Sequence, residues 1–231
     1  MSRIQTPYSH IIDEYNKMIS KNIKAIDSLS HSSNIRQIAD DTSFTLSTGE
    51  IIIVLEGVIA VEMQEHNFIL APGKAKTQAK KLFQVGKGIK GMFFGIVESY
   101  GPGIQLHYTA KKNVKVFSCN LEYFEKHFTQ PDKFTFLMNM MAITLAFLLD
   151  AHDERAIGTR YFVIRSMIYR YLKQKNEVVL HDPSLANFIL RRTKMSRSYL
   201  FQVLSDLKNG GYITMKNGEL VDIVNELPEK Y

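Results

Sequence analysis

Apolar side chains recur at helical spacing near the start of the chain, from Pro7 to about Leu29. Ile12, Tyr15 and Ile19 lie three and four residues apart, which places them on one face of a helix. Serines crowd the residues that follow, a composition typical of a loop. The pattern predicts an amphipathic helix with one side packed against the rest of the protein.

Short β-branched runs replace this pattern after Thr42. In FTLSTGEIIIVLEGVIAVEMQEHNFILAPG these runs are separated by turn-forming residues at Thr48-Gly49, Glu56-Gly57, Glu65-His66-Asn67 and Pro72-Gly73. Further short runs occur in KGMFFGIVES, GIQLHYTA and NVKVFSCN. Short strands at such regular spacing predict an antiparallel sheet that closes into a sandwich or roll.

Helical spacing returns after Asn120. Leu121–Phe128 is expected to form a short helix, and Pro131 to open a longer one, because proline suits the first turn. From Phe134 to Leu149 the longer helix is apolar nearly all round, so one small β-domain cannot cover it. Either a partner helix in a homodimer covers the second side, or the helix is buried within the monomer. The apolar run is shorter than about 18–20 residues, so no membrane span is predicted.

Gly158 separates the long helix from another amphipathic segment, TRYFVIRSMIYRYLKQKN. We therefore predict a boundary between a β-rich and a helical part near Arg155 to Thr159. The expected organisation is α+β in three pieces: an N-terminal helix plus β-roll over 1–130, a dimerisation helix over 131–157, and a C-terminal domain over 158–231.

The C-terminal domain is predicted to contain a helix that starts near Ser184. After Glu177 the sequence favours a short strand, and Asp182-Pro183-Ser184 then suits a helix start with proline in the first turn. Leu185 and Phe188 give this helix an apolar side.

A second helix follows a short turn around residues 193–195. Ser196 suits its N-cap, and Asn209-Gly210-Gly211 ends it. Lys216-Asn217-Gly218 predicts a tight hairpin turn between two strands. The apolar face of this helix has four residues at spacings of three and four: Leu200, Val203, Leu204 and Leu207. Helix, turn, helix and hairpin in this order form the plan of a winged helix-turn-helix.

The polar face of the second helix carries the side chains that duplex DNA would contact. Arg197 and Gln202 have the reach for bidentate contacts to guanine and adenine edges, and Ser198 lies beside Arg197. Ser196 and Tyr199 are expected to donate to phosphates. Basic residues surround the helix at Arg191, Arg192, Lys194, Lys208 and Lys216.

Charge supports this interpretation without proving it. The 231-residue chain has 29 basic and 23 acidic residues, a net charge of +6. Residues 181–218 hold six basic and two acidic residues and so carry +4 of that excess. One alternative is that this is an ordinary capped surface helix whose polar residues are solvated. A second alternative is a winged helix that contacts protein.

One cysteine, Cys119, excludes an intrachain disulfide and an all-cysteine metal site. The N-terminal residues lack the apolar core of a signal peptide, so a reducing cytoplasm is expected. No metal or cofactor is predicted. Cys119 is interpreted as a buried small apolar residue, with a redox-sensing thiol as the alternative.

At this point the chain resembles the Crp/Fnr superfamily of bacterial transcription regulators. SRSYLFQVLSDLKNGGYI is similar to the family's recognition helix, and IIIVLEGVIAV to a hairpin of its cyclic-nucleotide-binding-like β-roll. On that match Arg197, Ser198 and Gln202 occupy the principal base-contacting positions. The resemblance implies a homodimer on a pseudo-palindromic DNA site, with RNA polymerase as a further partner and no enzymatic activity.

The cyclic-AMP cassette of that family is missing. Members that bind cyclic AMP present a Gly-Glu pair and an Arg-Ser or Arg-Thr pair, whereas here Met92 follows Gly91. No lysine or arginine occurs between Lys90 and Lys111, so a buried phosphate would lack a charge-assisted partner. We therefore expect no regulation by cyclic AMP.

Four aromatic residues of this segment are candidates for lining a small apolar ligand pocket: Phe93, Phe94, Tyr100 and Tyr108. The alternative is that they fill the interior of the β-roll.

Overall fold

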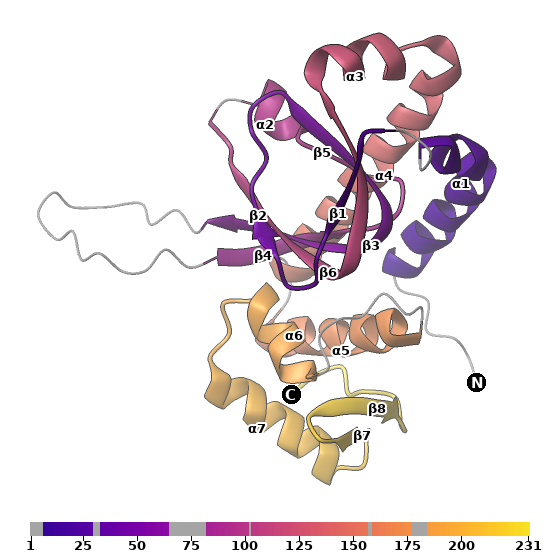
Figure 1. Cartoon of the computed structure of the whole chain (residues 1–231). Helices are drawn as coiled ribbons and strands as arrows, with labels where there is room; N and C mark the ends of the chain where they lie inside the picture. The colour runs from indigo at the N-terminus through magenta and orange to yellow at the C-terminus, as the bar shows by residue number, and fades with distance from the viewer. Residues whose placement is uncertain (1–6, 30–32, 65–81, 102, 157–158, 177–183) are drawn as a thin grey trace, which may run out of the picture. The chain divides into compact units, whose positions relative to one another are not determined.

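The computed structural model describes residues 7–29, 33–64, 82–101, 103–156, 159–176 and 184–231 (Figure 1). The chain divides into two compact units, Met1–Leu148 and Leu149–Tyr231. The predicted fold class is confirmed, because helices accompany an antiparallel sheet in the first unit and a winged helix forms in the second. The turn residues predicted at 65–67 and 72–73 lie outside the described residues.

The first unit begins with α1 (Pro7–Leu29), as the helical spacing predicts. The rest of the unit consists of β1 (Ile35–Ile38), β2 (Ser43–Phe44), β3 (Glu50–Gln64), β4 (Leu82–Gly88), β5 (Phe93–Phe94), α2 (Ile96–Tyr100), β6 (Leu106–Asn120), α3 (Leu121–Phe128) and α4 (Pro131–Ala156). The strands pair antiparallel in the order β1-β6-β3-β4, with β2 on β6 and β5 on β3. Figure 1 shows them curling into a roll.

One long strand, β3, replaces the two short strands that the sequence predicts around Glu56-Gly57. The chain does not turn there, because the register of β3 against β6 shifts on both sides of Glu56 and the strand continues through a bulge. Gly57 has φ +79°, and a Cβ on it would lie 2.7 Å from the Lys112 carbonyl oxygen. The glycine therefore serves a close approach of two strands and not a hairpin.

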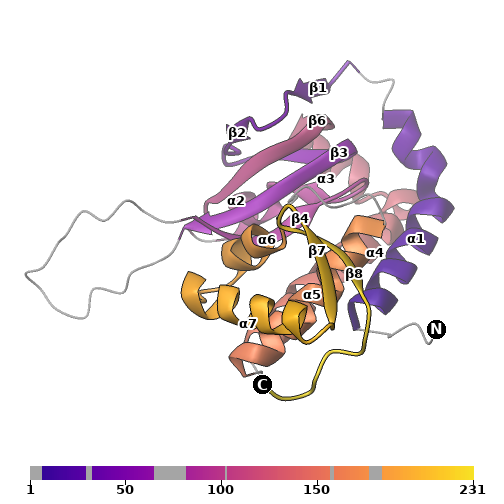
Figure 2. The same ribbon diagram turned by 90° about the horizontal axis from the view of Figure 1, so that it is seen from below.

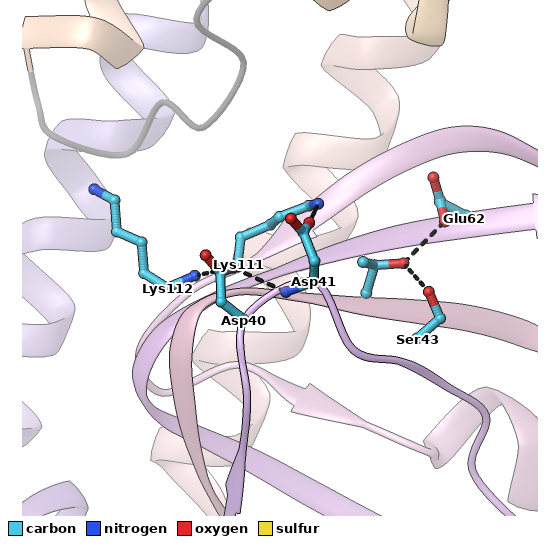
Figure 3. A network of polar contacts seen from close by, with 7 residues as sticks. Asp40, Asp41, Ser43, Glu62, Lys111 and Lys112 are labelled. Atoms are coloured by element: carbon cyan, nitrogen blue, oxygen red, sulfur yellow. Dashed lines mark hydrogen bonds and ion pairs between the residues drawn. The ribbon is translucent and has the colours of Figure 1, made fainter.

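The facing strand β6 bends at the same level. Lys112 and Asn113 have φ angles of 61° and 32°, in the left-handed region. The carboxylate of Asp40 accepts hydrogen bonds from the backbone N–H of Lys112 at 2.8 Å and of Asp41 at 2.9 Å. Asp41 in turn forms an ion pair with Lys111 (Figure 3). These contacts hold the bend of β6 from the β1–β2 connection.

The core of the first unit lies between the roll and its helices. Ile51 to Leu55 of β3 are almost fully buried, and α1 adds Ile12 and Ile26. The Tyr15 hydroxyl donates to the Lys90 carbonyl at 2.7 Å, which ties α1 to the end of the roll.

Helix α4 has two apolar sides, as the all-round pattern predicts. Phe136, Leu137 and Met140 are buried in the core of the first unit. The other side remains exposed at four large apolar residues of that unit: Phe134, Met138, Leu145 and Leu148. An exposed apolar side of this size is unusual for a helix surface that stays in water.

The length argument against a membrane span is wrong for α4. The helix extends beyond the apolar run, and its 20-residue segment Lys133–His152 is long and apolar enough to cross a membrane by length and composition. It is the one such helix in the part of the chain that the structure describes.

The second unit has its own core. It contains α5 (Arg160–Asn176), α6 (Leu185–Arg192), α7 (Arg197–Asn209), β7 (Ile213–Lys216) and β8 (Glu219–Ile223). Tyr171 of α5, Phe188 of α6 and Leu200 of α7 are fully buried together, with Leu220 from the hairpin. The strand predicted after Glu177, and the first two residues of the predicted helix start, lie outside the described residues.

Candidate nucleic-acid interface

Helix α6 forms the base of the site. Its N-cap is Ser184, whose hydroxyl accepts from the Asn187 N–H at 3.4 Å. Phe188 packs edge-on against Tyr171, with ring centroids 5.3 Å apart. At the other end the Thr193 hydroxyl donates to the Ile189 carbonyl at 2.9 Å, which fixes the turn that leads into α7.

Helix α7 begins and ends where its sequence predicts. The Ser196 hydroxyl caps it by accepting from the Tyr199 N–H at 3.4 Å. At its end the Tyr212 N–H donates to the Leu207 carbonyl and the Gly211 N–H to the Lys208 carbonyl. This is the Schellman arrangement, and Gly211 supplies the φ of +74° that it requires.

Four buried residues fix which side of α7 faces solvent. Leu200, Val203, Leu204 and Leu207 are each at most 4% exposed. Arg197, Ser198, Gln202 and Ser205 are exposed on the opposite side. The helix is therefore packed through its apolar face, and its polar face is exposed to solvent.

The hairpin is joined to α5 and α6 at its turn. Asn217 and Gly218 both have positive φ, 51° and 81°, as a type I′ turn needs. The Gly218 carbonyl accepts from the Leu185 N–H at 3.0 Å. The Lys175 ammonium donates to the Leu220 carbonyl and contacts the Glu219 carboxylate, each at 2.9 Å. Figure 2 shows the hairpin beside α7.

Most of the predicted DNA contacts are placed on the surface. The exposed residues are Arg191, Lys194, Ser196, Arg197, Ser198, Gln202, Lys208 and Lys216. Tyr199 is half-buried and lies edge-on to Tyr231, with ring centroids 6.3 Å apart. Of the six basic residues of this region, five are exposed and one, Arg192, is buried.

Arg192 does not have the surface position predicted for it. Its side chain is 5% exposed, lies 3.9 Å from the centroid of the Phe188 ring, and donates to the Phe188 carbonyl at 2.9 Å. In this position the Arg192 side chain packs on the Phe188 ring and contributes to the interior of the second unit. The guanidinium of Arg192 is thus covered by the protein, unlike the other basic side chains around α7.

One residue of the exposed face was missed by the sequence analysis. Phe201 is 54% exposed in the middle of α7, next to Gln202. The buried face was named by its spacing, and Phe201 was given no role. The helical spacing contained the correction, because Phe201 lies one turn after Arg197 and outside the Leu200–Val203–Leu204–Leu207 face.

Comparisons with known proteins agree with this geometry. The family described as winged helix-turn-helix DNA binding matches residues 160–229. A c-di-GMP-responsive global regulator from Xanthomonas campestris has a similar structure, with a TM-score of 0.59 and 16% identity over 87% of this chain and 98% of that one. A CRP/FNR-family regulator from Thermus thermophilus has a TM-score of 0.60 and 15% identity, covering 81% and 93%. This chain has the Crp/Fnr fold.

A curated relative is more similar in sequence. A protein of Escherichia coli K12 described as an inhibitor of hydrogen peroxide resistance is 29% identical over 191 residues, which cover 82% of this chain and 83% of that protein. The solved structures that share this fold include transcription regulators.

Within the Crp/Fnr fold, the four aromatic residues proposed for a ligand pocket have three different surroundings. Phe93 packs against Phe124 and other rings of the helical side, with centroids 5.9 Å apart. Phe94 packs on Tyr108 at 5.5 Å. Tyr100 is 56% exposed, and its hydroxyl donates to Glu125 at 2.6 Å. Three of the four fill the interior, and Tyr100 lies on the surface.

A carboxylate lies in the interior of the roll. The Tyr108 hydroxyl donates to Glu98 Oε1 at 2.6 Å, and both side chains are buried. Burial first, and then the Glu98 carboxylate, raise the pKa of Tyr108. Glu98 Oε2 is buried without a hydrogen-bond partner.

Cys119 is buried on β6, 8% exposed. Burial raises the pKa of the thiol to about 11, because the thiolate loses hydration there. The thiol is therefore protonated at neutral pH, which argues against the redox-sensing alternative.

We expect Cys119 of the native protein to react slowly with iodoacetamide at pH 7.5. The rate should rise as pH approaches 11, since only the thiolate is nucleophilic. The urea-unfolded chain is the control and should react at the rate of an ordinary thiol. Mass spectrometry of timed samples measures both, and equal native and unfolded rates would contradict the assignment.

Proposed function

We propose that this protein is a sequence-specific DNA-binding transcription regulator of Crp/Fnr type that acts as a homodimer on a pseudo-palindromic site. The observation that carries the proposal is the outward face of α7, with exposed Arg197, Ser198 and Gln202 opposite four buried apolar residues. A helix held in this way by a helix-turn-helix enters the major groove with its first turns toward the bases.

The residues divide into two roles on this proposal. Arg197 and Gln202 distinguish bases through bidentate hydrogen bonds. Arg191, Lys194, Lys208 and Lys216 contact phosphates, together with Ser196 and Tyr199 at the start of α7. Lys216 ends β7, next to the turn that the Leu185–Gly218 hydrogen bond holds against α6.

Replacing Arg197 or Gln202 by alanine should weaken binding to the preferred site by about 1–3 kcal/mol per half-site, because each change removes a base contact. Random duplex should still bind. Lys194→Ala is the matched comparison, since it should weaken both duplexes alike and lower the salt slope by about one. Mobility shifts at several salt concentrations measure both effects. Selective binding that survives both alanine changes would sink the recognition-helix assignment.

The second copy of the chain is proposed to cover the exposed side of α4. Phe134, Met138, Leu145 and Leu148 recur at spacings of three, four and seven along the helix, as in a two-helix seam. A C₂ pair of such helices buries the same face on both subunits. Two winged helices would then bind two half-sites about one helical turn of DNA apart.

Leu145→Arg should convert the dimer to a monomer at micromolar concentration, because a charge would lie in the seam. Val97→Arg is the matched control, since Val97 is an exposed apolar residue of α2, 41% exposed. Sedimentation equilibrium measures the mass of each variant. A monomeric wild-type protein would refute the seam, and recovery of the chain with membranes would favour the bilayer as the partner of α4.

Cyclic AMP is not the proposed effector. The roll has the carboxylate of Glu98 in its interior, and the sequence has no lysine or arginine between Lys90 and Lys111. Isothermal titration of the full chain with cyclic AMP should therefore show no binding at micromolar concentration. Saturable binding with a shift in DNA affinity would overturn this part of the proposal.

The relative that inhibits hydrogen peroxide resistance suggests the regulated genes. We infer that genes for peroxide resistance are the first targets to compare in genome-wide occupancy, with RNA polymerase as the partner at those promoters. A protein that binds DNA is expected in the cytoplasm. The competing function is a sensor module whose winged helix contacts protein, which predicts a dimer without salt-dependent binding to duplex DNA.

A further inference from the structure

Phe201 is an aromatic side chain without an evident role in the fold. It is 54% exposed on α7, whereas the helix is packed through Leu200, Val203, Leu204 and Leu207. An exposed phenyl ring contributes little to stability, because its apolar surface stays in water. Its position is therefore better explained by what α7 contacts than by what holds α7.

The surroundings of Phe201 narrow the partner to a nucleic-acid base. Arg197 lies one turn before Phe201 on the helix, and the exposed Gln202 follows Phe201 directly in the chain. Lys194 and Lys208 flank the helix at its two ends, both exposed. Cationic and amide side chains surround the phenyl ring. Such a surface suits DNA, which offers phosphates and base edges, better than it suits an apolar groove of a protein.

Only one base offers an apolar group in the major groove. The edges of guanine, cytosine and adenine present hydrogen-bond donors and acceptors there, and thymine adds its C5 methyl. A phenyl ring has neither donor nor acceptor. Its favourable partner in the groove is consequently the thymine methyl.

We propose that Phe201 is a specificity-determining residue that selects thymine in each half-site by packing against the C5 methyl. This rests on the proposed function, since it requires α7 to enter the major groove. Together with Arg197 and Gln202, it gives the helix three chemically different contacts to bases, two polar and one apolar.

The test uses duplexes selected from a random pool by the full-length protein. Each thymine of the selected site is replaced singly by deoxyuridine, which lacks only the methyl. We expect one position per half-site to lose affinity about three- to five-fold, the loss that follows from uncovering one apolar carbon. With Phe201→Ala the same replacement should have no effect.

Phe162→Ala is the matched control, because Phe162 is an exposed phenylalanine of α5, 45% exposed. It should leave the uridine profile as in the wild type. A profile without any thymine dependence, or one that Phe201→Ala leaves intact, would overturn the assignment while the proposed function stands. Failure of the wild-type protein to select any site from the pool would instead refute the proposed function itself.

Discussion

The burial of four apolar side chains on α7 is the constraint on which the proposed interface depends. Leu200, Val203, Leu204 and Leu207 allow one rotation of the helix about its axis. Removing one such buried leucine typically costs about 2–5 kcal/mol, so other rotations are strongly disfavoured. The polar face is outward as a consequence, and the hairpin, held to α6 through Gly218, lies beside it.

Close contacts between side chains and backbone also determine the shape of the β-roll and fill its interior. Its two long strands β3 and β6 kink together, because Gly57 allows the Lys112 carbonyl to approach closely. The interior that results is filled by rings and by the buried Glu98–Tyr108 pair. The fold is shared with solved CRP/FNR-family regulators, and the interior of this roll holds the side chain of Glu98.

Much of the architecture could be predicted because local chemistry decides it. The caps Ser184 and Ser196, the glycine end of α7 and the Asn217-Gly218 turn each act over a few residues. The prediction at Glu56-Gly57 was wrong, since the same turn-forming pair suits a hairpin or a bulge. Only the facing strand decides between the two.

The sequence by itself determined the order of elements, the outward face of α7 and the absence of a lysine or arginine between Lys90 and Lys111, because spacing and residue type are sufficient for these. Tertiary structure alone decided that Arg192 stacks on Phe188. It also decided that Cys119 is covered and that one side of α4 is not. Burial depends on neighbours that are distant in the chain, and no local pattern specifies which side chains they will cover.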